Sequence, residues 1–335
     1  MVRVRFAPSP TGSLHLGNAL SAVANRRYAD EHAGTLLLRI DDTDAARNVA
    51  GGVETIVAEL EWLGVPFDEG PLLQSGRAVR HREAAHAIGE PDAEGALRFG
   101  RTTLLRPDGS ATYQLASAVD DFDFAITHVI RGSDHRANAE LQTALIRALG
   151  GEPPEYIHHG LLLGDDGHKL SKRHGAASLA DLREAGLPAE AVLTYLEELG
   201  LPRHDVHLDL ARLRRLSIEA LGRLSDEELA ARVGVPESVA PVLRGARDLR
   251  EARDYAQQVL EPQPASVDAP ETLERFRELV AGGADARTIV RELKAVGGNL
   301  KAVRLALTGR DRGPELAALI EAIPRDELLE RAALR

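Results

Sequence analysis

The sequence predicts an α/β protein, in which a doubly wound, mostly parallel sheet with helices on both faces is followed by an all-α region. Strand-like and helix-like segments alternate through the first two-thirds of the chain, which is the pattern of such a sheet. From about Leu210 onward no convincing strand remains. The 335 residues suggest two or three domains, and 44% hydrophobic residues can form a sizeable core.

The N-terminal elements follow from local patterns. Strands are expected at 2–6, 36–40, 126–130 and 161–163. Helices are expected at 14–31, 52–63 and 137–149. Gly64 and Gly150 directly follow the second and third helices, and glycine readily adopts the conformation that ends a helix.

The pattern changes in two further regions. Between residues 75 and 99 Gly89, Pro91 and Gly95 interrupt the chain, and we expect no strands and little separate fold. In the helical half, capping boxes are expected at Ser178 with Asp181 and at Ser225 with Glu228. Prolines at 262, 264 and 270 predict a linker, followed by amphipathic helices at 270–282, 285–296, 300–307 and 314–323.

The composition excludes several classes of protein. There is no cysteine, so disulfides and thiolate metal sites are excluded, and we expect no zinc. Met1 leads directly into the first strand and no apolar run could span a bilayer, so we expect a soluble, cytoplasmic protein without a membrane partner. The net charge of -11 argues only weakly against a nucleic-acid partner, because a basic track is sufficient. Nothing predicts an oligomer, and we expect a monomer.

Two short segments far apart in the chain indicate phosphate binding. H-L-G-N, at 15–18, follows the first strand and opens a helix, where backbone N–H groups are available to an anion. K-L-S-K-R, at 169–173, places three cations in a loop after the turn G-D-D-G. Taken alone, the first string is more typical of an ordinary helix start and the second of a solvated basic turn. Together they predict two sides of one triphosphate site.

Other chemistry is not indicated. The chain has no Walker-type phosphate loop, no H-E-x-x-H string and no G-x-S-x-G nucleophile elbow. His81 and His86 are five residues apart, which does not place them on one helical face for a metal. We therefore expect no bound metal ion other than one carried by a nucleotide.

Longer segments resemble the glutamate-specific branch of the class I aminoacyl-tRNA synthetases. They are R-F-A-P-S-P-T-G at 5–12, L-R-I-D-D-T-D at 38–44, Y-Q-L-A at 113–116 and H-V-I-R-G at 128–132, and the two phosphate segments resemble the signature motifs of that class. The resemblance is close over 1–68 and 108–200 and loose in the tail. It implies a Rossmann-like catalytic domain and a ligase activity.

The resemblance also implies a division of the chain. Residues 1–165 would form the catalytic domain, in which 75–99 is a shortened remnant of the insertion that binds the acceptor stem. Residues 166–209 would be a stem-contact region carrying K-L-S-K-R. Residues 210–335 would be a helical domain similar to the family's anticodon-binding domain.

The reaction implied by the resemblance has two steps: a glutamate carboxylate attacks the α-phosphate of ATP, and the glutamyl group then passes to a tRNA. ATP would enter with Mg²⁺ as substrate. The catalytic residues carried over are His15, Lys169 and Lys172. The ATP-binding residues carried over are Ser9, His15, Gly17, Asn18, Lys169, Lys172 and Arg173. His158 and His159 resemble a family region near the adenine.

For glutamate, the resemblance implies a set of cationic and polar contacts, because arginine binds both oxygens of a carboxylate. They are Arg5, Ser9, Asp41, Tyr113, Ser117 and Arg131. The family usually has glutamate at position 41 and often asparagine at 117, so the fit of the substrate is open here. Taken singly, each arginine could be an ordinary surface residue and Tyr113 a residue at the edge of the core.

The leading hypothesis is a compact glutamyl-tRNA synthetase that charges tRNA(Glu). The alternatives are an enzyme like glutamyl-queuosine tRNA(Asp) synthetase, a glutamate-adenylating ligase with a non-tRNA acceptor, and a catalytically silent binding paralogue. The sequence leaves open which tRNA is charged, whether tRNA(Gln) is accepted, whether activation requires tRNA, and how the acceptor stem is held. For that last task we consider a basic rim of Arg77, Arg80, Arg82, Arg98 and Arg101, which equally suits a solvated face.

Overall fold

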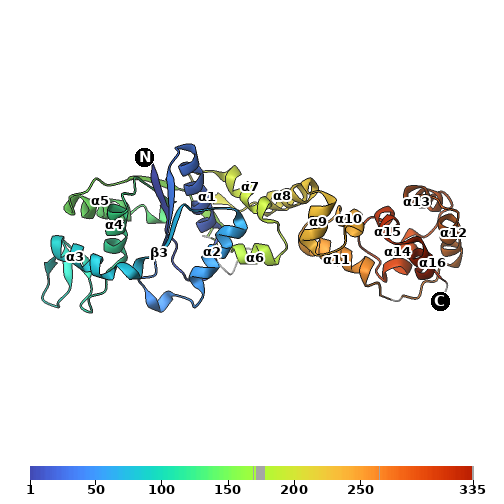
Figure 1. Ribbon diagram of the computed structural model, residues 1–335, viewed down its shortest axis with the longest axis horizontal. Coiled ribbons are helices and arrows are strands. Elements are labelled where there is room, and N and C mark those ends of the chain that lie inside the picture. The colour runs from blue at the N-terminus through green and yellow to red at the C-terminus, as the bar shows by residue number, and fades with distance from the viewer. Residues whose placement is uncertain (169, 171–177, 264, 334–335) are drawn as a thin grey trace. The chain divides into compact units, whose positions relative to one another are not determined.

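The computed structural model describes residues 1–168, 170, 178–263 and 265–333. The chain divides into two compact units (Figure 1). The first comprises Met1–Glu184 with Val192–Asp209, and the second comprises Ala185–Ala191 with Leu210–Arg335.

A five-stranded parallel sheet forms the centre of the first unit, in the order β3-β2-β1-β7-β8. Its strands are β1 (Arg3–Phe6), β2 (Thr35–Ile40), β3 (Glu69–Leu73), β7 (His128–Gly132) and β8 (Glu155–His159). Helix α1 (Leu16–Glu31) packs on β1, β2 and β7 and buries Leu16, Leu20 and Val23. The predicted doubly wound α/β class is confirmed.

Strand register places three arginines and a histidine on one face of this sheet. Side chains of paired residues in parallel strands point the same way, and side chains alternate along each strand. The deciding registers pair Arg5 with Leu37, Val4 with His128, and Arg131 with His158. Arg39, Arg5, Arg131 and His158 therefore form a row across β2, β1, β7 and β8. The face of Val4 packs instead against α1.

The connections add further helices and two short strands to this unit. They are α2 (Gly52–Leu63), α4 (Tyr113–Asp123), α5 (Asn138–Ala148), β9 (Leu162–Leu163), α6 (Leu179–Glu184), α7 (Ala189–Leu199) and β10 (Val206–His207). The first turn of α7, up to Ala191, belongs to the second unit. Gly64 ends α2 in the left-handed conformation, with φ 76°, as predicted. The capping box of Ser178 and Asp181 is also present, each side chain accepting the other's backbone N–H.

The prediction of no strands between residues 75 and 99 is wrong. The interval holds η2 (Gln74–Arg77), α3 (Ala78–Ile88), β4 (Glu90–Pro91) and β5 (Leu97–Phe99), and the two strands form an antiparallel sheet with β6 (Thr102–Leu105), which follows the interval. Leu97, Leu104 and Leu105 pack with α3, α4 and α5 in one apolar cluster. The strands are too short for alternation to be visible, and the packing of α3 and α4 stabilises them.

The second unit is helical in its described part, apart from short 3₁₀ turns. Its elements after residue 209 are α8 (Leu210–Arg223), α9 (Asp226–Val233), η5 (Glu237–Val239), α10 (Ala240–Leu243), α11 (Leu249–Leu260), α12 (Pro270–Ala281), α13 (Ala286–Ala295), α14 (Leu300–Thr308), α15 (Leu316–Ala322) and α16 (Arg325–Arg331). They enclose an apolar core that contains Phe276, Leu293 and Leu307. The predicted capping box of Ser225 and Glu228 is present, and the four predicted C-terminal helices are found within two residues of their expected ends.

Candidate active site

Two buried arginines lie at the centre of the sheet face described above. Arg5 on β1 is 4% exposed and Arg131 on β7 is 6% exposed. Arg5 donates from Nε to Asp121 of α4 over 3.2 Å. Arg131 donates from Nη1 to Gln142 of α5 over 2.9 Å, and its buried Nη2 has no hydrogen-bond partner in the described part of the chain. The guanidinium of Arg131 therefore has donor capacity left for an anion.

The electrostatics of this site favour an anionic ligand. Burial, and next the charge of Arg5, lower the pKa of Arg131. Burial and the charge of Arg131 lower the pKa of His158 to about 4, so His158 is neutral near pH 7. Its Nε2 then accepts from Nε of Arg131, 3.4 Å away. Two like charges held together out of water are stabilised by a bound carboxylate.

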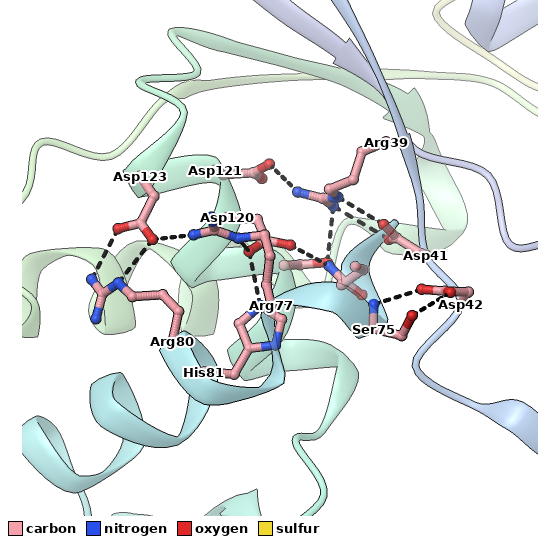
Figure 2. Close-up of polar contacts among 12 residues, drawn as sticks. Arg39, Asp41, Asp42, Ser75, Arg77, Arg80, His81, Asp120, Asp121 and Asp123 are labelled. Carbon is pink, nitrogen blue, oxygen red and sulfur yellow. Dashed lines mark hydrogen bonds and ion pairs between the residues drawn. The ribbon is translucent and has the colours of Figure 1, made fainter. Parts of the chain in front are cut away.

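A third arginine, Arg39 on β2, organises the neighbouring carboxylates (Figure 2). It is 1% exposed and binds Asp41 through Nε at 2.7 Å and Nη2 at 3.3 Å. Its Nη1 donates to Asp121 over 2.7 Å, and its Nη2 also approaches Ser117 Oγ at 3.3 Å. Burial lowers the pKa of Arg39, but the charges of Asp41 and Asp121 outweigh it and raise that pKa overall. Burial raises the pKa of Asp41, which Arg39 offsets only in part.

Asp120, which precedes Asp121 on α4, faces α3 and not the arginine row (Figure 2). It accepts from His81 at 2.8 Å, from Gln74 at 2.9 Å and from Arg77 at 2.7 Å. Burial raises the pKa of Asp120, but the hydrogen bond from His81 and the charge of Arg39 outweigh it and lower that pKa. Consecutive carboxylates thus join α4 both to the arginine row and to the segment that precedes α3.

The segment after β1 carries the predicted nucleotide residues. Ser9 is exposed in the turn that precedes α1. His15 occupies the N-cap position of α1, and its carbonyl accepts the N–H groups of Asn18 and Ala19. A Cβ added to Gly17 would meet no protein atom within 4 Å, and Asn18 is exposed beside it.

The chain returns to this turn just after the basic loop. His15 pairs with Ser178 in an antiparallel bridge, and the N–H of Leu179 donates to Leu14 O over 2.9 Å. The described residues on the C-terminal side of K-L-S-K-R therefore lie against H-L-G-N, although the two strings are far apart in sequence. Lys169, Lys172 and Arg173 themselves lie outside the described residues.

The remaining predicted glutamate contacts lie around the arginine row. Tyr113 begins α4, is partly buried, and has its ring 6.2 Å from that of His135. Asp41 and Ser117 are buried and both bind Arg39. The two histidines expected near the adenine make different contacts. His158 contacts Arg131, whereas His159 is buried and contacts Ser21 of α1 over 2.8 Å. The structure thus joins Arg5, Asp41 and Ser117 in one hydrogen-bond network with Arg39 and Asp121, whereas Arg131 bonds to Gln142 and His158.

Sequence reasoning missed Arg39, Asp121 and Gln142. Arg39 had a visible signal, since a charged residue within the apolar run T-L-L-L-R-I requires a buried counter-charge. The adjacent acids of D-D-F-D were missed because helix α4 was not predicted, so its acids were not assigned to a face. Gln142 carries no local signal.

The basic rim considered above is largely neutralised. Arg77 pairs with Asp120 and Asp123, Arg80 binds both oxygens of Asp123 at 2.9 Å, and Arg98 pairs with Asp92. Asp42, which follows the predicted glutamate-binding residue Asp41, accepts hydrogen bonds from the backbone N–H and the hydroxyl of Ser75. These three arginines brace the segment around α3, which favours the solvated structural face over an RNA-binding rim.

The described part of the chain contains neither a metal-binding cluster nor a membrane-spanning helix. No group of three or more His, Asp or Glu side chains there is arranged to hold a metal ion. No helix in the same residues is long and apolar enough to cross a bilayer.

Comparison with known proteins assigns the chain to a family. The family described as tRNA synthetases class I (E and Q), catalytic domain, matches residues 1–90 and 94–216. Glutamate–tRNA ligase 1 of Rubrobacter xylanophilus is 36% identical over 431 aligned positions, covering 98% of this chain and 96% of the relative. Glutamate–tRNA ligase 1 of Rhodospirillum rubrum is 34% identical, with 98% of each chain covered. The first alignment is longer than this chain, so the relative carries segments that this chain lacks.

Solved structures agree on the fold. A glutamate–tRNA ligase from Elizabethkingia meningosepticum, solved in complex with its amino acid, superimposes with a TM-score of 0.78 over 99% of this chain and 98% of that one, at 22% identity. Fold, signature segments and family match together define a class I aminoacyl-tRNA synthetase. Within that class, the chain belongs to the family of tRNA synthetases specific for E and Q, whose similar members here are glutamate–tRNA ligases.

Proposed function

We propose that this chain activates L-glutamate with ATP and transfers the glutamyl group to the 3′ end of tRNA(Glu). The observation that carries the proposal is the pair of buried arginines, Arg5 and Arg131, of which one has a buried Nη2 without a partner in the described chain. Glutamate carries two carboxylates and so suits two cationic sites. The relatives that cover nearly the whole chain are named glutamate–tRNA ligases, which supports the same substrate.

In the first step, an oxygen of the α-carboxylate attacks the α-phosphate of ATP, the bond to the β-phosphate breaks, and pyrophosphate leaves. Arg5 with Tyr113 would bind the side-chain carboxylate, and Arg131 the other one. Ser9 and Asp41 would face the amine. Arg39 would keep Asp41 and Ser117 in place. The protein's main tasks are to align two anions and neutralise charge on the phosphates.

For ATP, the H-L-G-N turn and the basic loop would act from two sides. His15, Asn18 and Ser9 would bind on the α1 side, with the adenine packed over Gly17. Lys169, Lys172 and Arg173 would bind the departing pyrophosphate, and Mg²⁺ would arrive with ATP. We expect no zinc, because the chain has no thiolate to ligate it.

In the second step, a terminal ribose hydroxyl of the tRNA attacks the glutamyl carbonyl, AMP leaves, and its phosphate accepts the hydroxyl proton. We propose residues 1–165 as the catalytic domain, with 75–99 in place of the acceptor-stem insertion. Residues 166–209 would contact the stem and 210–335 the anticodon. We expect a monomer in the cytoplasm.

Replacing Gly17 with alanine should separate stability from nucleotide binding. Alanine is more favourable than glycine in a helix by up to about 1 kcal/mol, and a Cβ at this site meets no protein atom within 4 Å, so the variant should be as stable as the wild type or more stable. The Cβ should nevertheless displace a base packed on the backbone and raise KM for ATP about tenfold. Thermal unfolding and steady-state kinetics measure the two effects.

Gly222→Ala is the matched control for this prediction. Gly222 is also helical, on α8, and its added Cβ also meets nothing within 4 Å. It should gain similar stability with no change in KM for ATP. An unchanged KM for ATP in Gly17→Ala would show that the adenine does not pack over Gly17.

The proposed function is tested by transfer of labelled glutamate to purified total tRNA in the presence of ATP, with periodate-treated tRNA as control. Label on intact tRNA, absent after periodate, supports the proposal, and sequencing of the charged species distinguishes tRNA(Glu) from tRNA(Gln) and tRNA(Asp). Adenylate formation without labelled tRNA would show that the glutamyl group passes to an acceptor other than tRNA. Absence of both adenylate and labelled tRNA would refute the proposed activity.

A further inference from the structure

We infer that Glu59 is a positioning residue for the ATP-dependent step, because its carboxylate holds the turn that opens α1 and reaches, through Ser13, the start of α6, which follows the basic loop in the chain. The inference rests on the proposed function. Glu59 is on α2, outside both signature strings, and none of the residues carried over from the family resemblance contributes to its contacts.

The first contact is with the turn that opens α1. The N–H of Leu14, the residue before the N-cap His15, donates to Glu59 Oε2 over 2.7 Å. The hydroxyl of Ser13 donates to Glu59 Oε1 through a short hydrogen bond. Both carboxylate oxygens are thus used to hold the two residues that determine where His15 begins the helix.

The second contact runs through Ser13 to the segment that follows the basic loop. The N–H of Ala180 donates to Ser13 Oγ over 3.2 Å. A backbone N–H can only donate, so Ser13 accepts from Ala180 and gives its own proton to Glu59. The result is a directed chain from Ala180 through Ser13 to the carboxylate, in which each hydrogen bond polarises the next.

Two further contacts align the same segments. Leu179 N donates to Leu14 O over 2.9 Å, and His15 pairs with Ser178. Glu59 therefore fixes the start of α1 directly and the start of α6 through one hydroxyl. A shift at Glu59 moves the start of α1 relative to residues 178–180.

The burial of Glu59 indicates that its side chain has a role beyond the packing of α2. It is 8% exposed and shares the buried face of its helix with Ile56, Leu60 and Leu63. Among the described residues no cation pairs with it, so the hydrogen bonds from the 13–14 turn and the N-terminus of α1 stabilise its charge. An apolar side chain would serve the packing of α2 better, whereas only an acceptor with two free oxygens can hold Ser13 and Leu14 together.

The test is Glu59→Gln, which keeps the shape but replaces one acceptor by an NH₂ donor that cannot accept from Leu14 or Ser13. We expect KM for ATP to rise about tenfold, as for loss of a charged hydrogen bond, with KM for glutamate unchanged. ATP–pyrophosphate exchange in the presence of tRNA gives both constants. Equilibrium binding of ATP alone should weaken by a similar factor.

Glu61→Gln, an exposed residue of the same helix, is the matched control and should behave as wild type. Ser13→Ala should raise KM for ATP in the same direction, and the double variant should lose less than the sum of the two changes because both act in one chain. An unchanged KM for ATP, or equal changes for ATP and glutamate, overturns the inference. If Glu59→Gln does not fold, the KM of Ser13→Ala decides the question.

These outcomes are distinct from failure of the proposed function. That failure would appear in the wild type as ATP binding without glutamate-dependent exchange. The effect of Glu59→Gln on ATP binding would still decide whether Glu59 positions the nucleotide site.

Discussion

Replacing Arg131 with methionine should lower kcat/KM for glutamate about a thousandfold while leaving KM for ATP near its wild-type value. The expected loss corresponds to removal of one partner of a desolvated charged pair between arginine and carboxylate. Arg131 is buried, and its Nη2 has no competing partner in the described chain, so we expect that donor to bind the substrate carboxylate. Exchange kinetics at varied glutamate and ATP measure the two constants.

The same variant should lose little stability. Burial and the neighbouring Arg5 lower the pKa of Arg131, so its charged form is disfavoured in the folded protein. Methionine fills similar volume without that charge, although Gln142 loses its donor, and the unfolding free energy should change by no more than about 1 kcal/mol. Arg147→Met, an exposed site on α5, is the control. Parallel losses of activity and stability would assign Arg131 to the scaffold instead of the substrate.

Replacing Arg39 with methionine should have the largest effect on stability. The change leaves Asp41 and Asp121 buried without their shared cation, and breaking a buried ion pair from one side costs roughly 3–5 kcal/mol. Chemical unfolding at pH 8 measures the loss. Arg3→Met is the matched control, because Arg3 pairs with Glu69 on the same sheet but at a solvent-exposed site, where the cost is about 1 kcal/mol or less.

The stability loss of Arg39→Met should depend on pH with a defined sign. Burial already raises the pKa of Asp41, and without Arg39 that pKa rises further above its unfolded value. A group whose folded pKa is raised takes up protons on folding, so the penalty is absent at low pH and appears as pH rises through the folded pKa. The difference from wild type should therefore be smaller at pH 5 than at pH 8. A pH-independent difference would show that lost packing, not unpaired charge, causes the instability.

Local signals predicted much of the fold correctly. Gly64 ends α2 as expected because its left-handed conformation depends only on its own backbone. The capping boxes at Ser178 and Ser225 were predicted for the same reason, since their contacts span three residues. The strands of the 75–99 interval were missed because their stability comes from packing against α3 and α4, which no local pattern records.

The candidate site was predictable only in part. Arg5, Arg131, His15 and Gly17 were identified from strings of neighbouring residues, and their roles stay predictions. Arg39 and Asp121 were missed because their significance depends on a contact between β2 and α4, 82 residues apart. Glu59 was missed for a similar reason, since it contacts a turn 45 residues earlier in the chain.

By itself the sequence determined the fold class, and it predicted the two candidate phosphate-binding strings and the candidate anion-binding arginines, because these depend on residue type, periodicity and short spacing. Only the tertiary structure decided that Arg39, Arg5 and Arg131 share one face, that Arg39 binds Asp41 and Ser117, and that Glu59 is joined through Ser13 to the start of α6. The reason is strand register and helix packing. They bring together side chains that are distant in the chain, and in a buried site the partner of a charge determines its role.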